Sequence, residues 1–443
     1  MRNNILLLII FLTFNIVVKT NAQTSVYDTI NIVSYNVLDY GMPNTVSCPT
    51  LNSPNRHQYL KTIINYTKPD ILGLVKMTAL PTTFATDTIT KMVLDSACQG
   101  CYAHVDYTNL SGYEKTNMLF YKKAKFGYVS TTPLYYADNT VSDICLHKLF
   151  YKDTNLVYTH DTTFLSIILV HLQSGASSAS SRAAEITGVM NWLNANVTTL
   201  GNYMFMGDFN TQNSSEACYQ SIITSPNIPT LFFDPVENLG NWAGTPTLYS
   251  NYLTQSTRLI DPGDCGATGG MDDWFDHVMV SEAILYGSKS VQYVADSYTT
   301  IGQDGQHTLG AITGTPTNTT VPADVLNALY YMSSHLPLSV KLAFQLSSTY
   351  AINDKNNLGN DIDVFPNPIN DFIMIRFHLN YKKNIKVKLV NTLSITLKEI
   401  NFNKNSFNNE IKINANNITK GIYFIKIMDE NGNILTVKKV IKS

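Results

Sequence analysis

Short runs of apolar residues alternate with stretches of helical spacing between residues 28 and 345. Apolar runs of this length predict buried strands, and apolar positions three and four residues apart predict helices. Strands are expected at Thr29–Leu38, Asp70–Val75, Asn117–Tyr121, Phe164–Leu172, Tyr203–Asp208 and Phe275–Ser281. Helices are expected at Arg56–Thr67, Thr83–Ala97 and Ala183–Asn196. This alternation predicts stacked layers of helix and sheet.

The pattern changes beyond residue 345. Residues 346–361 are rich in Ser, Asn, Asp and Gly and have no periodic apolar positions, which predicts a linker. From residue 362 to 443, apolar and polar residues alternate with a period of two, as in Phe372–Phe377, Ile385–Val390 and Tyr423–Ile427. That period predicts a small antiparallel β-sandwich.

A targeting segment is expected at residues 1–22. Arg2 gives a short positive region, Ile5–Val18 is almost wholly apolar, and Ala22 ends a stretch of short residues. The apolar run is too short for a comfortable membrane span, and no second run follows it. We therefore expect a cleaved signal peptide, no transmembrane segment and a location outside the cytoplasm.

Composition agrees with a globular protein that has one large core and a smaller second domain. Hydrophobic residues make up 44% of the 443 residues and charged residues only 14%, which excludes a disordered chain. The formal charge of −2 does not indicate nucleic acid by itself. A polyanionic substrate would need a local basic patch or bound cations.

The chain contains six cysteines. In an oxidising compartment they are expected to form disulfides, although the pairing cannot be deduced from sequence. Cys98 and Cys101 form a CxxC pair, which is also half of a zinc site. No second CxxC and no HxxxH accompanies it, so disulfides are favoured.

Polar residues follow five apolar runs where strands are expected to end. One is Gly207–Asn210, and the others are Ser34–Val37, Val170–Gly175, Asp273–Ser281 and Ser333–Pro337. A Gly-Asp-x-Asn segment alone is typical of a turn. At a strand end, however, Asp208 and Asn210 can project from one face and converge on a single phosphate or metal.

The five motifs, in this order, resemble the endonuclease/exonuclease/phosphatase superfamily of metal-dependent phosphodiesterases. The resemblance covers residues 28–345. It implies a four-layered α/β sandwich of the DNase I-like kind, with two central mixed sheets, outer helices and the site at one end of the sheets. It also implies a hydrolase acting on phosphoester bonds with a Mg or Mn divalent cation.

Hydrolysis of a phosphodiester requires an activated water and positive charge or donors at the phosphoryl oxygens. His335 is the candidate base, because a neutral His can accept a proton at physiological pH. The resemblance implies that Asp276 orients His335 and that His171 donates to a phosphate oxygen. Three more residues would position the nucleophile, the phosphate and any metal: Asn36, Asp208 and Asn210.

Two positions depart from the family pattern. Lys76 stands where the family has its principal metal-ligand Glu, and Ser334 stands where it has an Asp. Divalent cations prefer several oxygen ligands that include carboxylates, and an ammonium group repels them. Only Asn36 and Asp208 are left as weak metal ligands, so poor metal affinity is expected.

Three functions remain open. In the first, the protein is a phosphodiesterase in which Asp208, Asp276 or Asp39 recruits a cation weakly, or in which Lys76 supplies the positive charge. Alternatively, it is an inactive relative that binds phosphate or nucleic acid, or it acts through a surface elsewhere. Nucleic acid is the leading substrate, because Gly302–His307 resembles a loop of secreted bacterial family members presumed to be nucleases.

The C-terminal region resembles a second family. Val364–Pro368, Gly421–Tyr423 and Lys438–Ser443 are similar to the C-terminal sorting domain of the type IX secretion system. This resemblance implies the secretion machinery as a partner and a secreted or cell-surface location. A carbohydrate-binding or immunoglobulin-like module is the alternative.

Overall fold

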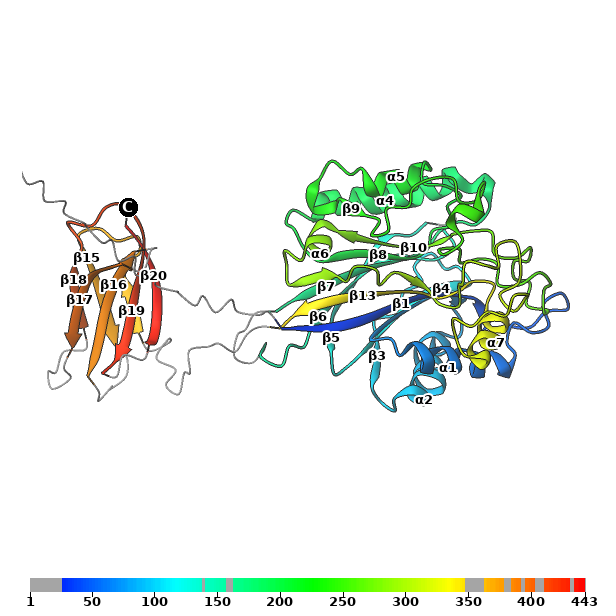
Figure 1. Cartoon of the computed structure of the whole chain (residues 1–443), viewed down its shortest axis with the longest axis horizontal. Coiled ribbons are helices and arrows are strands. Elements are labelled where there is room, and N and C mark those ends of the chain that lie inside the picture. Colours follow the sequence, from blue (N-terminus) through cyan, green and yellow to red (C-terminus); the bar gives the residue numbers. More distant parts are fainter. Residues whose placement is uncertain are drawn as a thin grey trace, which may run out of the picture. The chain divides into compact units, whose positions relative to one another are not determined.

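The computed structural model describes residues 26–137, 140–156, 162–346, 362–377, 384–391, 395–402, 410–430 and 434–442. The chain divides into two compact units, residues 1–347 and 348–443 (Figure 1). The expected targeting segment and nearly all of the expected linker lie outside the described residues. None of the helices that the structure describes is long and apolar enough to cross a membrane.

A seven-stranded sheet forms one half of the core of the larger unit. Its strands, from edge to edge, are β11 (Val291–Tyr293), β13 (Leu338–Gln345), β1 (Tyr27–Tyr40), β2 (Ile71–Thr78), β4 (Lys115–Lys122) and β3 (Tyr102–His104), and β12 (Thr299–Thr300) pairs with β13. Strands β1 and β2 run parallel, and the other neighbours run antiparallel.

A six-stranded sheet forms the other half. Its strands are β5 (Phe126–Tyr135), β6 (Ile144–Tyr151), β7 (Phe164–His171), β8 (Tyr203–Asp208), β10 (Asp276–Ser281) and β9 (Phe232–Phe233). Strands β7 and β8 run parallel, and the remaining pairs run antiparallel. Both sheets are therefore mixed, as the sequence resemblance implies.

The two sheets pack face to face through one continuous apolar core. Gly73 of β2 faces the opposite sheet, and a Cβ there would be 2.3 Å from Cε of Met206 and 2.8 Å from Leu169. A larger residue at this point would force these two core side chains to move.

Helices cover the outer faces and complete four layers (Figure 1). On the side of the seven-stranded sheet lie α1 (Pro54–Thr67), the π-helix η1 (Phe84–Leu94), α2 (Asp95–Ala97) and α7 (Ala323–Met332). On the other side lie α4 (Ala179–Asn196), α5 (Ala217–Ile223) and α6 (Glu282–Tyr286). Three short 3-10 helices occur at Ala176–Ser178, Ile228–Thr230 and Pro246–Tyr249.

Helix α1 shows how local sequence fixes an element beside the site. The Ser53 side chain accepts a hydrogen bond from the backbone N–H of Asn55, and Pro54 occupies the first turn, where its missing N–H is not needed. The helix ends at Lys68 in a left-handed conformation. Its buried Arg56 donates to the carbonyl oxygens of Val37 and Leu38, which fixes the end of β1.

The smaller unit is an antiparallel β-sandwich, as its period of two predicts. One sheet contains β14 (Ile362–Phe365), β15 (Phe372–Phe377) and β18 (Glu410–Asn414). The other contains β17 (Thr396–Phe402), β16 (Ile385–Asn391), β19 (Gly421–Asp429) and β20 (Ile434–Lys442). Alternate apolar residues of the strands, such as Ile373 and Ile375, meet in a separate core.

The cysteines correct one expectation. Disulfides join Cys48 to Cys265 and Cys98 to Cys101. The CxxC pair is therefore a disulfide and not part of a zinc site. The remaining two, Cys145 and Cys218, are free and buried, so the expectation that all six form disulfides is wrong. Burial raises the pKa of both thiols to about 12, which keeps them protonated.

Candidate active site

Strand ends bring the predicted polar residues together. His171 on β7, Asp208 on β8 and Asp276 on β10 lie opposite one another in the ladder of the six-stranded sheet. Asn36 on β1 and His335, just before β13, come from the facing sheet. All five side chains are buried, with at most 4% of the surface of any one exposed. Residues far apart in sequence thus form one compact polar cluster inside an apolar core.

His335 and Asp276 form the central pair. Nδ1 of His335 lies 2.7 Å from Oδ2 of Asp276, and both groups are almost wholly buried. Because Nδ1 faces a carboxylate, it carries the proton, which leaves Nε2 as the acceptor in the neutral ring. Burial alone would lower the pKa of His335, but the carboxylates of Asp276 and Asp208 raise it above its ordinary value.

Asn36 holds the second carboxylate. Its amide Nδ2 donates to Oδ2 of Asp208 at 2.8 Å and lies 3.3 Å from Nε2 of His335. Its Oδ1 accepts the backbone N–H of Leu38, which fixes the orientation of the amide. Burial raises the pKa of Asp208 to about 6, and His335 opposes this rise. Burial therefore disfavours the charge on Asp208, and the contacts with His335 and Asn36 favour it.

Asn210 has a mainly structural position. Its backbone is left-handed, with a φ of 51°, and its N–H donates to Oδ1 of Asp208. Its side-chain amide donates to the carbonyl oxygen of Leu172, at the end of β7. Asn210 therefore fixes the loop after β8 against the loop after β7, and it reaches the cluster through Asp208.

His171 lies on the other side of Asp208. Its Nε2 is 4.0 Å from Oδ2 of Asp208, and its buried Nδ1 has no hydrogen-bond partner among the described residues. Burial, with Lys76 and Lys115 nearby, lowers the pKa of His171 well below its usual value. The ring is therefore neutral at physiological pH, and its buried Nδ1 is left without a partner among the described residues.

Lys76 lies at an irregular point of β2. Its φ is 62°, the pairing of β2 with β4 shifts register between Leu74 and Met77, and its N–H donates to Oδ1 of Asn117. Its ammonium forms no hydrogen bond or ion pair of 4.0 Å or less within the described part of the chain. Burial lowers its pKa, and Asp39 raises that pKa more than Asp208 does.

Within the described residues, Lys76 therefore makes no direct contact with Asp208, and the two groups are linked only by electrostatic coupling. A second lysine, Lys115, forms an ion pair of 2.9 Å with Asp39. Lys115 and Lys76 both act on the pKa of His171, which places two cations beside the cluster. Of the two lysines, only Lys115 is paired with a carboxylate among the described residues, so the charge of Lys76 is not directly neutralised.

The serines before His335 divide into two roles. The Ser333 hydroxyl donates to the carbonyl oxygen of Asn36 and accepts the backbone N–H of His335, so it fixes the segment before β13 against β1 of the same sheet. Ser334 is fully buried, and its hydroxyl has no partner among the described residues. The sequence motif identified Ser334 by its departure from the family but gave no role to Ser333.

Gln255 is the site residue that sequence reasoning missed. Its amide nitrogen lies 2.5 Å from Nε2 of His335. Its backbone forms antiparallel bridges with both Asp273 and His335. No apolar period or motif marks this part of the chain, so nothing in the sequence indicates that Gln255 reaches the predicted base.

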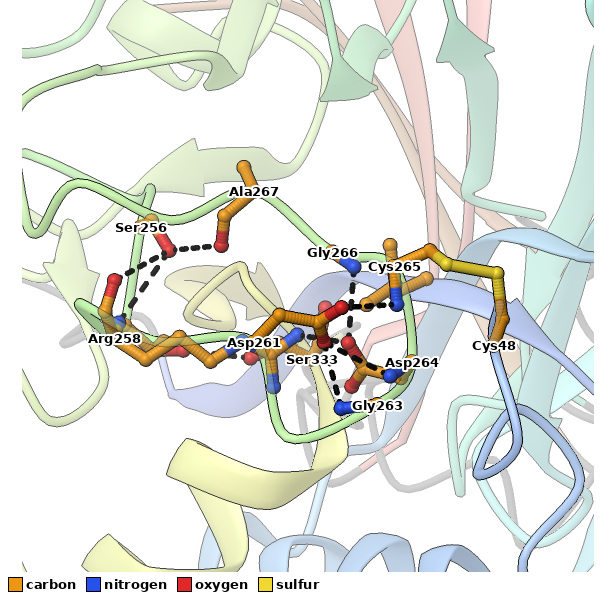
Figure 2. Close-up of polar contacts among 12 residues, drawn as sticks. Cys48, Ser256, Arg258, Asp261, Gly263, Asp264, Cys265, Gly266, Ala267 and Ser333 are labelled. Carbon is orange, nitrogen blue, oxygen red and sulfur yellow. Dashed lines mark hydrogen bonds and ion pairs between the residues drawn. A yellow bond between two sulfur atoms is a disulfide. The ribbon is translucent and has the colours of Figure 1, made fainter. Parts of the chain in front are cut away.

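A covalently fixed loop follows Gln255, and Figure 2 shows the contacts that hold this loop. The disulfide to Cys265 anchors one end of the loop, and the Arg258 guanidinium makes a fully buried ion pair of 2.7 Å with Asp264. Asp261 accepts the backbone N–H groups of three loop residues: Gly263, Asp264 and Cys265. The loop begins with Ser256, directly after Gln255, so these contacts also fix the Gln255 backbone.

The donor set does not fit the Mg or Mn ion that the family resemblance implies. The Oδ1 of Asn36 is occupied by a backbone N–H, and both oxygens of Asp208 accept hydrogen bonds. The Lys76 ammonium stands near the remaining carboxylates. Among the residues that the structure describes, no group of three or more His, Cys, Asp or Glu is arranged to hold a metal. The expected weak ligands, Asn36 and Asp208, are already hydrogen-bonded to the protein.

Taken together, the fold and the cluster define a four-layered α/β sandwich with a carboxylate–histidine pair at the strand ends. Residues 363–443 match the family model of the secretion system C-terminal sorting domain. This match confirms the sorting domain expected from sequence and supports secretion or attachment to the cell surface. No curated protein matches the chain.

Solved structures similar to this chain include three with informative names. The catalytic domain of human Nocturnin, solved with a bound sulfate anion, is 13% identical, with 73% of this chain and 97% of that chain covered and a TM-score of 0.42. An endonuclease/exonuclease/phosphatase family protein from Bacteroides thetaiotaomicron is 14% identical, with 72% and 99% covered and a TM-score of 0.43. A mannosyl-6-phosphatase from the same organism is 14% identical, with 71% and 100% covered and a TM-score of 0.42.

The family that the sequence motifs resemble is thus named among the similar structures. Identities and scores at this level assign no activity to the chain. The chemistry of the site rests on its own geometry.

Proposed function

We propose that the protein is a secreted phosphodiesterase whose site uses lysine charge where its relatives use a divalent metal. The observation that carries this proposal is the buried contact of 2.7 Å between His335 and Asp276, in one cluster with Asn36 and Asp208. A carboxylate on Nδ1 sets the tautomer in which Nε2 can accept a proton from water. No packing requirement explains such a pair inside an apolar core.

His335 acts as the general base in this proposal. Its neutral Nε2 takes a proton from the attacking water as the new P–O bond forms and the bond to the leaving oxygen breaks. The imidazolium, stabilised by Asp276 and Asp208, then gives that proton to the leaving oxygen. The same carboxylates raise the pKa of His335, which makes it a stronger base. Asn36 holds Asp208 in place, and the neutral ring of His171 donates to a phosphoryl oxygen.

Lys76 supplies the positive charge. Lys76 is half-buried, and a partly dehydrated ammonium group stabilises charge on the phosphoryl oxygens better than one in water. Among the described residues Lys76 has no ion pair to give up when the substrate enters, whereas Lys115 is already paired with Asp39. We therefore assign Lys76 to the phosphate and Lys115 to the local charge balance.

The sorting domain gives this function its location. We propose that residues 1–22 direct export and that the type IX secretion machinery recognises residues 362–443, with residues 346–361 as the linker. Nucleic acid is the proposed substrate, on the resemblance of Gly302–His307 to a loop of secreted family members. Another phosphodiester is the alternative substrate.

An assay of the purified full chain tests the proposal. Single- and double-stranded DNA, RNA and bis(p-nitrophenyl) phosphate are incubated with and without EDTA. We expect hydrolysis that survives EDTA and is lost in His335→Ala and in Lys76→Ala, whereas the control His104→Ala, outside the cluster, stays active. Hydrolysis that EDTA abolishes, or that His335→Ala retains, would contradict it.

One observation favours a second function, a phosphate- or nucleic-acid-binding protein without turnover. The amide of Gln255 lies against the Nε2 of His335 that a catalytic water would need. Calorimetric titration with inorganic phosphate and with an oligonucleotide separates the two functions. Binding without hydrolysis of any phosphodiester supports the second, and loss of that binding in Lys76→Ala places the ligand at this cluster.

A further inference from the structure

The Nε2 atom of His335 is enclosed in this structure. The amide nitrogen of Gln255 lies 2.5 Å from it, that of Asn36 lies 3.3 Å away, and Oδ2 of Asp208 lies 3.8 Å away. His335 is only 1% exposed. With protein atoms on these sides, neither a water nor a phosphoryl oxygen can take up a reactive position at Nε2 until one neighbour moves.

Gln255 is the neighbour that can move. Asn36 and Asp208 are almost wholly buried and hydrogen-bonded to each other, whereas Gln255 is partly exposed. Its backbone is fixed by the bridges to Asp273 and His335 and by the loop held through Cys265. Only the side chain is free to turn, and rotation of a partly exposed side chain leaves the core intact.

We propose that Gln255 is a gating and positioning residue of this site. Its amide closes over His335 in the free protein and turns outward to donate to a phosphoryl oxygen when a phosphoester enters. The closing role stands on the contact with His335 alone. The role toward a phosphoryl oxygen rests on the proposed function.

An amide suits this role because it has both a donor and an acceptor. Its N–H group donates to the Nε2 of neutral His335. If the ring becomes protonated, a half-turn of the amide presents Oε1 to the new N–H group. A Glu at this position could only favour the protonated ring of His335, and a Leu could form a hydrogen bond with neither the neutral nor the protonated ring.

Other charged groups also shift the pKa of His335, and their effects are common to the wild type and to the Gln255 variants. Asp276 and Asp208 favour the protonated ring, and Lys76 opposes it. His171 and Asp273 are also coupled to His335, and burial raises the pKa of Asp273 to about 7. Substitutions at Gln255 leave all five groups in place, so differences among Gln255 variants report on the amide itself.

The first experiment measures how accessible His335 is. The full chain is treated with diethyl pyrocarbonate, and modification of the His335 peptide is followed by mass spectrometry. We expect Gln255→Ala to react about two- to tenfold faster than wild type, the factor that one net hydrogen bond is worth. Gln292→Ala, on the exposed side of β11, is the matched control and should react at the wild-type rate. An unchanged rate in folded Gln255→Ala would overturn the gate.

The second experiment measures the pKa of His335 by NMR of its ring nitrogens. Gln255→Glu should raise the pKa, because a carboxylate favours the protonated ring. Gln255→Leu removes the hydrogen bonds to both forms of the ring and should lower the pKa, because the bond from the charged ring to Oε1 is the stronger of the two. A merely structural residue would not move the pKa in opposite directions. Shifts of the same sign in both variants, or no shift in either, would overturn the inference. Gln255→Glu is nearly isosteric, so the test does not depend on whether Gln255→Ala folds.

Neither measurement requires turnover, so the two proposals fail separately. If both experiments succeed and no phosphodiester is hydrolysed, the gate stands and the phosphodiesterase proposal fails. If a diester is hydrolysed and neither experiment shows an effect, the phosphodiesterase stands and the gate fails. Protection of His335 in Gln255→Ala by inorganic phosphate would show that the opened site accepts the anion.

Discussion

Replacing Asp276 by Asn changes one atom of the site and removes one charge. In the wild type the carboxylate receives the Nδ1 proton of His335 at 2.7 Å. The second oxygen of Asp276, Oδ1, has no hydrogen-bond partner within the described residues, so nothing fixes the orientation of an amide there. The amide can therefore present its NH₂ group to Nδ1, which moves the ring proton to Nε2. His335 then carries a proton where it should accept one.

The expected magnitude follows from the same geometry. Two unit charges 2.7 Å apart interact by about 6 kcal/mol at an effective dielectric near 20. Burial of both groups offsets part of this energy, so it is an upper estimate for the stabilisation of the imidazolium. Loss of the orienting carboxylate in a comparable triad lowers kcat by about 10⁴-fold, which corresponds to about 5.4 kcal/mol. The two figures agree, and we expect Asp276→Asn to lose about three to four orders of magnitude in kcat.

The assay combines kinetics with a direct view of the tautomer. Hydrolysis of bis(p-nitrophenyl) phosphate gives kcat and KM, and NMR of the ring nitrogens shows which nitrogen carries the proton. The expected result is a large fall in kcat, a small change in KM and a proton on Nε2. A variant that folds, keeps the Nδ1 proton and retains kcat within tenfold would refute the assignment of His335 and Asp276.

Three further predictions test the charge and the frame of the site. Lys76→Glu combined with Ser334→Asp should raise Mn²⁺ affinity at least about 100-fold in calorimetry. The double substitution removes a charge repulsion of several kcal/mol and adds two carboxylate ligands. An unchanged affinity in the folded variant would show that Lys76 is not at the metal position. The pH–rate profile should be bell-shaped. The rate should rise through the pKa of His335, above 6.5, because the base must be neutral, and fall through the pKa of Lys76, below 10.5, because its charge is needed. A flat profile from pH 6 to 10 would argue against both roles. Replacing Cys48 and Cys265 by Ser opens a link across 217 residues and should cost about 5 kcal/mol in calorimetric unfolding on the chain-entropy estimate, against about 2 kcal/mol for the disulfide that spans three residues.

Most of the fold of the larger unit was predictable because its central strands are buried on both faces. Strands such as β2 and β8 are continuous apolar runs, and the sequence placed them within a few residues. The interior strands β6 and β13 were missed although they are mostly buried, because polar residues such as His147 and Lys341 interrupt their apolar runs. Strand β5, at the edge of its sheet, was also missed. Its side chains are mostly half exposed, so neither an apolar run nor a period of two marks it. Strands at sheet edges are less buried, so their sequences need neither an apolar run nor a regular alternation of apolar and polar residues.

The cluster of strand-end residues was predictable for a different reason. Polar residues at the ends of neighbouring strands meet in one rung, as Asp208 and Asp276 do. Gln255 lies instead in a long segment with little regular structure, whose course is set by a disulfide and by the buried pair of Arg258 and Asp264. Such long-range contacts leave no local signal in the sequence, so the residue closest to the predicted base was not predictable.

The charges of the site explain why the His335 pair matters more here than it would beside a metal. Lys115 is paired with Asp39, so Lys76 supplies a single positive charge, and an ammonium group cannot lower the pKa of a bound water as a metal ion does. Activation of the water must then come from His335 alone. The carboxylates that raise its pKa supply that basicity, and the partly exposed Gln255 keeps it closed to solvent until an anion enters. A site of this kind should lose its activity with Asp276, not with a chelator.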